Sequence, residues 1–245
     1  MENNEPLYFA IDSDILRRLT SIDLLLENNP NYDLRNAPDP VLKKWSGYFF
    51  RLYKKMLNDE LRLVIVDAVY QESQHSISLL GFMKKYCYFP KINAVNYQRK
   101  AEEARRLANS YCEPYMVGDR EYSAPMKKVF NAQSNTFAPT NDCYIMAQAT
   151  IEGISLITAN GKDFIFDDKL GKENHERAKG IMNINISKGY YTTKQGGFNT
   201  ARPFHIQTIG PMLKDDVLNI DSVSPINDFD IGNDLISDDD LKIEQ

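Results

Sequence analysis

Acidic and amide side chains follow several apolar segments of this sequence, at points where a strand would give way to a helix. The stretch "YFAIDSDILRRL" places Asp12 and Asp14 between an apolar segment and a helical one. The carboxyl ends of parallel strands meet at one edge of an α/β sheet, and ligands bind along that edge. Further candidates for such a site follow later apolar segments: Glu72, Asp142, Asn160 and Asp163.

Carboxylates gathered in one place repel one another, and a divalent cation relieves that repulsion. A cation held in this way lowers the pKa of a bound water and stabilises a leaving oxygen, which suits phosphodiester hydrolysis. The chain has three cysteines and three histidines, scattered without the spacing of metal ligands. Any metal must therefore be bound by oxygen, which favours Mg²⁺ or Mn²⁺.

Each of these residues also has a purely structural interpretation. Ser13 or Asp14 could cap the helix that follows, because both residue types are favoured at helix N-caps. Glu72 and Asp142 could be ordinary acids of a first helical turn, which the helix dipole favours. Asn160 could be a turn residue, and Asp163 could be a helix cap. For each residue taken singly, both interpretations stay open.

The composition is that of a globular protein of 245 residues, 42% of them hydrophobic. No apolar run approaches the ~18 residues of a membrane span, and the first residues lack a signal-peptide pattern. An odd number of scattered cysteines indicates reduced thiols and not a disulfide framework. We therefore expect a cytoplasmic protein that does not enter the membrane.

The net charge of −5 is unevenly distributed along the chain. Residues 214–245 contain nine Asp, one Glu and two Lys, whereas residues 1–213 carry 27 basic and 24 acidic side chains. Residues 187–214 combine four Lys or Arg with four aromatic side chains and no acid, which suits single-stranded RNA. The alternative is a β-hairpin whose aromatic side chains pack on the core. The candidate RNA-binding residues are Lys188, Tyr190, Tyr191, Lys194 and Arg202.

Apolar segments rich in β-branched residues alternate with amphipathic segments. The strand segments are "YFAI", "LRLVIV", "ISLITAN" and "GIMNINI", and the helical segments include residues 41–58, 94–111 and 139–153. Helical spacing predicts that Trp45 and Phe49 face the core from the first of these helices, and Tyr97 from the second. The alternation predicts an α/β fold with a central parallel sheet and helices on both faces.

The sequence resembles the PIN-domain nucleases, a family that includes the VapC-like toxins of bacterial toxin–antitoxin pairs. "FAIDSDIL" matches the family's first motif, an apolar strand followed by Asp and Ser, with Asp14 where Asn is usual. "VIVDAVYQES" matches the second motif, an apolar strand leading to a Glu that opens a helix, at Glu72. "NDCYIMAQA" matches the third motif at Asp142, and "LITANGKDF" matches the fourth at Thr158 and Asn160.

The resemblance implies a metal-dependent endoribonuclease domain at residues 7–190 with a PIN-like fold. It implies RNA as the substrate, Mg²⁺ or Mn²⁺ as the cofactor, and a cognate antitoxin and a second copy of the chain as partners. Extra helix and a C-terminal extension at residues 191–245, ending in an acidic tail, distinguish the chain from a compact toxin. The implied catalytic acids are Asp12, Glu72, Asp142 and Asp163, of which the first three are metal ligands. The implied supporting residues are Ser13, Asp14, Thr158 and Asn160.

Two other interpretations stay open. "AIDSD" also matches the motif of haloacid-dehalogenase-type phosphatases, in which Asp12 would be the nucleophile and Asp14 the acid. That interpretation leaves Glu72 and Asp142 without a role. The second is a PIN-like binding scaffold that has lost its activity, which Asn160 motivates because many PIN domains carry Asp there.

The acidic tail, residues 215–245, leads to a first prediction. It carries ten acidic residues against one Lys, with apolar side chains between them, so we expect it to fold back on the basic part of the chain. The alternative is a disordered tail that only promotes solubility. Removing the tail, so that the chain ends at Lys214, should tighten binding of single-stranded RNA at low salt, because the tail no longer competes with phosphates. Fluorescence anisotropy at matched ionic strength measures the difference. Equal affinities at low salt would show that the tail does not compete.

Overall fold

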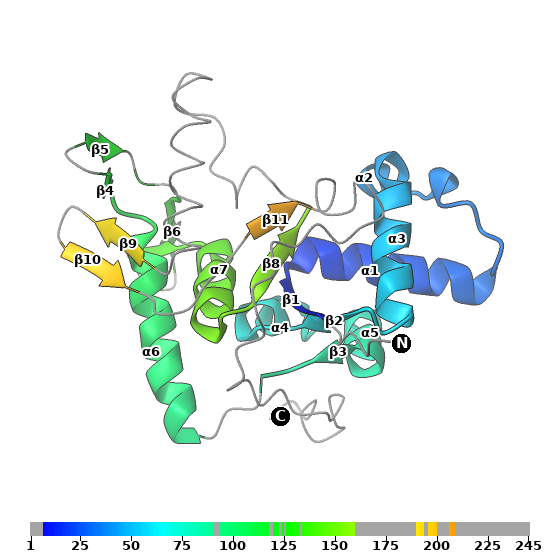
Figure 1. Cartoon of the computed structure of the whole chain (residues 1–245), viewed down its shortest axis with the longest axis horizontal. Coiled ribbons are helices and arrows are strands. Elements are labelled where there is room, and N and C mark those ends of the chain that lie inside the picture. Colours follow the sequence, from blue (N-terminus) through cyan, green and yellow to red (C-terminus); the bar gives the residue numbers. More distant parts are fainter. Residues whose placement is uncertain are drawn as a thin grey trace, which may run out of the picture. The chain divides into compact units, whose positions relative to one another are not determined.

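The structure is a computed structural model that describes residues 7–90, 94–117, 120–122, 124, 126–132 and 134–159, and the backbone of strands at 190–193, 196–199 and 206–208. Contacts divide the chain into two compact units (Figure 1). Within the described residues, the first unit comprises those up to 90, 157–159 and 207–208, and the second those from 94 to 156 and from 190 to 206.

The main sheet has the strand order β11-β8-β1-β2-β3, and the four strands β8, β1, β2 and β3 are parallel. Strand β1 lies in the middle, with β2 on one side and β8 on the other. The bounds are β1 Leu7–Ile11, β2 Leu61–Val64, β3 Cys87–Tyr88, β8 Ser155–Thr158 and β11 Ile206–Thr208. The predicted α/β class with a central parallel sheet is thereby confirmed.

Both faces of this sheet are covered where β1 and β2 run side by side. Phe9 and Ala10 are neighbours in β1, and Leu63 and Val64 are neighbours in β2; all four side chains are buried. Successive side chains of a strand point to opposite faces, so each pair places one buried side chain on each face of the sheet. This burial explains why the segments "YFAI" and "LVIV" do not alternate between apolar and charged residues.

The helices of the first unit pack around α1 and the sheet. Helix α1 contacts α3, α4 and α5, while α3 also contacts β2 and α5 contacts β3. The bounds are α1 Ser13–Asn28, α2 Pro40–Lys44, α3 Ser46–Leu57, α4 Asp67–Ser73 and α5 Ile77–Tyr86, with a short 3₁₀ helix at Leu34–Asn36. Helix α1 is therefore the element that joins the other helices of this unit.

The prediction of a single helix at residues 41–58 is wrong, because the segment forms two helices, α2 and α3. Asp39 caps α2 by accepting from the N–H groups of Val41 and Leu42, both at 2.7 Å. At Trp45 the backbone leaves the helical conformation, with φ −111° and ψ 23°, before α3 begins. The predicted core-facing side therefore starts at Phe49, and Trp45 is 41% exposed.

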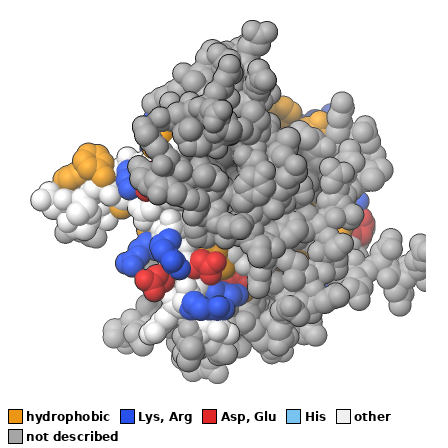
Figure 2. All heavy atoms as spheres, turned by 60° about the vertical axis from the view of Figure 1, so that its left-hand side comes forward, with side chains coloured by type: hydrophobic (Ala, Val, Ile, Leu, Met, Phe, Trp, Pro, Cys, Tyr) orange, Lys and Arg blue, Asp and Glu red, His pale blue; other side chains and the backbone are white. Residues whose placement is uncertain are grey.

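In the second unit, α6 (Ala94–Ser110) packs along α7 (Asn141–Glu152). These two helices confirm the helices predicted at residues 94–111 and 139–153. Lys100 Nζ lies 2.5 Å from Glu152 Oε2, and the sulfur atoms of Cys112 and Cys143 lie 3.6 Å apart. Tyr97, predicted to face the core, is exposed. Figure 2 shows Lys and Arg side chains interleaved with Asp and Glu on the face that carries α6.

The rest of the second unit consists of short antiparallel strands. Strands β6 and β7 form a hairpin, and β10-β9-β4-β5 form a four-stranded sheet. The bounds are β4 Tyr115–Val117, β5 Arg120–Tyr122, β6 Lys128–Asn131, β7 Thr136–Pro139, β9 Tyr190–Thr193 and β10 Gly196–Asn199. The β9–β10 hairpin is the strand pairing that the alternative interpretation of residues 187–214 predicted. The predicted domain boundary after residue 190 falls inside β9.

None of the helices that the structure describes is long and apolar enough to cross a membrane. The strand predicted at "GIMNINI" and the acidic tail lie outside the described residues.

A buried carboxylate on α1 is hydrogen-bonded to side chains of α3 and α5. Asp23 accepts hydrogen bonds from the hydroxyls of Tyr53 on α3, at 2.5 Å, and Tyr86 on α5, at 2.8 Å. Lys85 Nζ lies 3.3 Å from Asp23 Oδ2 and 2.6 Å from Glu27 Oε1. Burial, together with the hydrogen bond to Asp23, raises the pKa of Tyr53, so its hydroxyl remains the donor.

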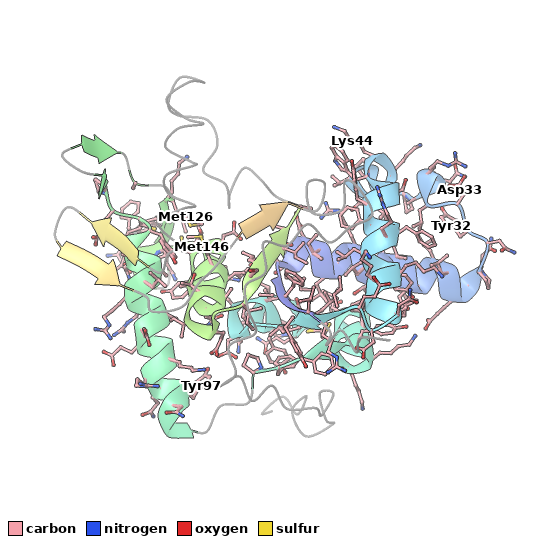
Figure 3. The ribbon with its side chains drawn as sticks, in the orientation of Figure 1. Tyr32, Asp33, Lys44, Tyr97, Met126 and Met146 are labelled. Carbon is pink, nitrogen blue, oxygen red and sulfur yellow. The ribbon has the colours of Figure 1, made fainter. Side chains whose placement is uncertain are left out.

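Tyr53→Phe should lower the free energy of unfolding by about 1.5–3 kcal/mol, because a buried carboxylate loses a donor. Chemical denaturation measures this change. The matched control is Tyr32→Phe, whose exposed hydroxyl bonds the carbonyl of Asn36 at 2.9 Å (Tyr32 is labelled in Figure 3). The control should change stability by less than about 0.5 kcal/mol. Equal effects of the two variants would contradict the role of Asp23.

Candidate functional site

Asp12 lies at the junction where β1 ends and α1 begins. Its Oδ1 accepts from the backbone N–H of Ile15 at 2.7 Å, which makes Asp12 the N-cap of α1. Its Oδ2 accepts from the hydroxyl of Thr158, the last residue of β8. The Asp12 side chain is buried, with 2% of its surface exposed. The sequence interpretation that gave the cap to Ser13 or Asp14 is therefore wrong.

Glu72 reaches this junction from a different helix. The Ser13 hydroxyl donates to Glu72 Oε2. Glu72 is the penultimate residue of α4, so the prediction that it opens a helix is wrong; Asp67 occupies the first turn. A carboxylate near a helix C-terminus meets the negative end of the dipole, and the Ser13 hydroxyl offsets that disadvantage.

Two hydrogen-bonded pairs, Thr158 with Asp12 and Ser13 with Glu72, are joined because Asp12 and Ser13 are consecutive residues. We call these four residues the Asp12 cluster. Its members come from the β1–α1 junction, from α4 and from the end of β8. The cluster contains two carboxylates and two hydroxyls, which are all hard oxygen ligands. Among the residues that the structure describes, no group of three or more His, Cys, Asp or Glu is arranged to hold a metal ion.

Asp14, predicted as a supporting residue of the site, has different contacts. Its carboxylate lies 2.7 Å from Arg17 and 3.3 Å from Arg18. Arg18 also approaches Asp39, the cap of α2, with 3.6 Å between Nε and Oδ2. Asp14 therefore anchors α1 to the start of α2 through Arg18, and it is not part of the Asp12 cluster.

Asp142 belongs to the second unit, where it is the second residue of α7. This position confirms the prediction of an acid in the first turn of a helix. The next residue, Cys143, is buried, and its hydrogen-bonding contact with the Cys112 thiol lowers the pKa of Cys143.

The other predicted site residues lie outside the part of the chain whose side chains are described. These are Asn160, Asp163, Lys188, Lys194 and Arg202, together with Tyr190 and Tyr191, for which only the backbone of β9 is described. Sequence reasoning overlooked Asp67, a further carboxylate at the carboxyl edge of the sheet. The signal for it was present, because Asp67 directly follows the apolar run "LVIV".

No protein-family model, curated protein or solved structure matches this chain. Functional assignment therefore depends on the sequence motifs and on the geometry of the Asp12 cluster.

Thr158→Val should lower the free energy of unfolding by about 1–3 kcal/mol, because the buried Asp12 carboxylate loses a hydrogen-bond donor. Thr158→Ser keeps the hydroxyl and is the matched control, with a smaller loss from the missing methyl group. Urea denaturation of both variants measures the difference. If Val and Ser at this position had the same effect, the hydroxyl of Thr158 would not stabilise Asp12.

Proposed function

We propose that the chain is a PIN-like, metal-dependent endoribonuclease that hydrolyses phosphodiester bonds of RNA. The observation that carries the proposal is the Asp12 cluster, which joins residues from three of the four sequence motifs. The Ser13–Glu72 hydrogen bond joins residues 59 positions apart, and the Thr158–Asp12 hydrogen bond joins residues 146 positions apart. Unrelated caps and turn residues are not expected to form such long-range hydrogen bonds. A toxin–antitoxin pair and a homodimer stay predictions from the resemblance.

In this proposal, the hydroxyls hold the carboxylates in fixed orientations. Thr158 and the N–H of Ile15 fix the two oxygens of Asp12. Ser13 fixes one oxygen of Glu72, and the second oxygen of Glu72 serves as a ligand or orients the attacking water. Hydrogen bonds of this kind orient metal ligands and increase their basicity.

The donor chemistry of the cluster fits a hard divalent cation. Mg²⁺ binds through one or two carboxylates and keeps several waters, which leaves room for substrate phosphates. Asp12 and Glu72 would hold the ion, and Asp142 is added as a ligand on its sequence motif alone. When bound, the ion supplies a water of lowered pKa and stabilises the leaving oxygen.

The phosphatase interpretation gives Asp14 the role of a proton donor to the leaving group. Its carboxylate is instead engaged with Arg17 and Arg18. Those two ion pairs suit a structural role in α1, so the geometry favours the nuclease interpretation.

The test is cleavage of a labelled single-stranded RNA with Mn²⁺ and with EDTA. Asp12→Asn should reduce cleavage at least about 100-fold, because a ligand charge is lost. The amide oxygen of Asn still caps α1, but its NH2 group does not accept from the Thr158 hydroxyl, so a loss of stability similar to that of Thr158→Val is expected. Melting temperatures show that the variant is folded under the assay conditions. Ser13→Ala should reduce cleavage about 10- to 100-fold by releasing Glu72, and Asp142→Asn tests the third ligand in the same assay.

The matched control is Asp33→Asn, which removes the same charge at an exposed side chain paired with Arg35 at 2.7 Å. This variant should cleave RNA at the rate of the unchanged chain. Full activity of Asp12→Asn, or full activity in EDTA, would refute the proposal. Release of phosphate from p-nitrophenyl phosphate without RNA cleavage would favour the phosphatase interpretation.

A further inference from the structure

The segment that forms α2 and α3 is locally basic in a chain whose acids outnumber its bases, 34 to 29. Residues 40–58 contain five Lys or Arg, five aromatic side chains and no acid. The fold sorts the aromatic side chains: Phe49 and Tyr53 are buried, whereas Trp45 and Phe50 are 41% and 37% exposed. Basic and aromatic groups therefore share the outer side of these two helices.

Each outward ring on this side has a cation over it. The rings of Trp45 and Tyr48 are neighbours, with centroids 5.7 Å apart and planes inclined by 39°. Lys44, labelled in Figure 3, extends from the end of α2. The cation–ring pairs, with distances to the ring centroid, are Lys44–Trp45 at 5.0 Å, Arg51–Tyr48 at 5.0 Å and Lys54–Phe50 at 5.5 Å. We call these six residues the α3 surface.

The break between α2 and α3 creates this surface. In one continuous helix, Trp45 would lie on the same side as Phe49 and Leu52, which are buried. A single exposed aromatic side chain needs no explanation. Three cation–ring pairs lie in one acid-free segment: those of Trp45 and Tyr48 adjoin, and that of Phe50 lies further round α3. Cations and rings exposed together favour an anionic, ring-containing ligand.

The α3 surface is attached to the helix that begins at the Asp12 cluster. Arg18 on α1 pairs with Asp39, which caps α2, at 3.6 Å. The Arg18 guanidinium carbon also lies 5.9 Å from the centre of the Phe49 ring on α3. Both features belong to the first unit, and α1 carries the two together.

We infer that the α3 surface binds a single-stranded segment of RNA, with bases stacked on its rings and phosphates held by its cations. Proteins that bind single strands combine a basic track with aromatic side chains on which bases stack. A duplex keeps its bases paired and offers the rings little to stack on. The inference rests on the proposed function for the choice of RNA, and it adds the place where substrate is held.

Two other occupants fit the surface less well. A helix that lies in a membrane needs a wide apolar face for insertion, but the apolar side of α3, with Phe49, Leu52 and Met56, is buried in the protein. Protein interfaces are depleted in Lys at their centres, whereas Lys44 and Lys54 lie over the rings here.

The experiment measures binding of a fluorescent oligouridylate to the full-length chain in EDTA, so that binding is separated from cleavage. Trp45→Ala should weaken binding about tenfold by removing a stacking platform, with an unchanged salt dependence. The double variant Lys44→Gln, Lys54→Gln should weaken binding and make the plot of log K against log salt shallower by about 1.4, which is about 0.7 for each phosphate that the protein no longer neutralises.

Matched controls come from α6, where basic and acidic side chains alternate. Tyr97→Ala removes an exposed ring, and Arg105→Gln with Arg106→Gln removes two charges; neither should change affinity or salt dependence. Trp45→Phe keeps a ring and should restore most of the binding. Melting temperatures confirm that the variants fold.

Unchanged affinity in both α3-surface variants, or no binding by the unchanged chain, would overturn the inference. So would variants that lose binding to phosphatidylserine vesicles, or change the oligomeric mass, while RNA affinity is kept. RNA binding that depends on the α3 surface, without Mn²⁺-dependent cleavage, would keep the inference and remove the proposed function. Mn²⁺-dependent cleavage with unaffected α3-surface variants would do the reverse.

Discussion

The site depends on the buried carboxylate of Asp12, which accepts one hydrogen bond from α1 and one from β8. Oδ1 of Asp12 accepts the N–H of Ile15 and starts α1, while Oδ2 accepts the hydroxyl of Thr158 at the end of β8. A carboxylate with 2% exposure is costly unless both oxygens are hydrogen-bonded. The end of β1, the start of α1 and the end of β8 must therefore adopt their positions together, and the same contacts that stabilise the fold keep the side chain rigid.

The structural and the chemical interpretations of Asp12 are consequently compatible. A helix cap uses one carboxylate oxygen, and a ligand held ready for a cation needs its orientation fixed by such a bond. Asp14, two positions further on, illustrates the contrast, because its partners Arg17 and Arg18 commit it to holding α1 in place. Asp12 and Asp14 are separated by one residue, and their different hydrogen-bond and ion-pair partners give them different roles.

Local charge is more informative than net charge in this protein. On α6, four cations are interspersed with two acids, which offset part of their positive charge. On α2 and α3, five cations occur without an acid between residues 40 and 58. A net charge of −5 therefore coexists with a basic, aromatic surface attached to the helix that starts at Asp12.

The sequence by itself determined β1, β2 and β8, the helices α1, α6 and α7, and the acid in the first turn of α7, because apolar periodicity and capping act over a few neighbouring residues. Only the tertiary structure decided which hydroxyl meets which carboxylate, since β8 pairs beside β1 from 146 positions away. The tertiary structure also decided that α4 starts at Asp67, so that Glu72 lies near the end of α4. It decided as well that the helical conformation is interrupted at Trp45. Such outcomes depend on packing between distant segments, which periodicity does not encode.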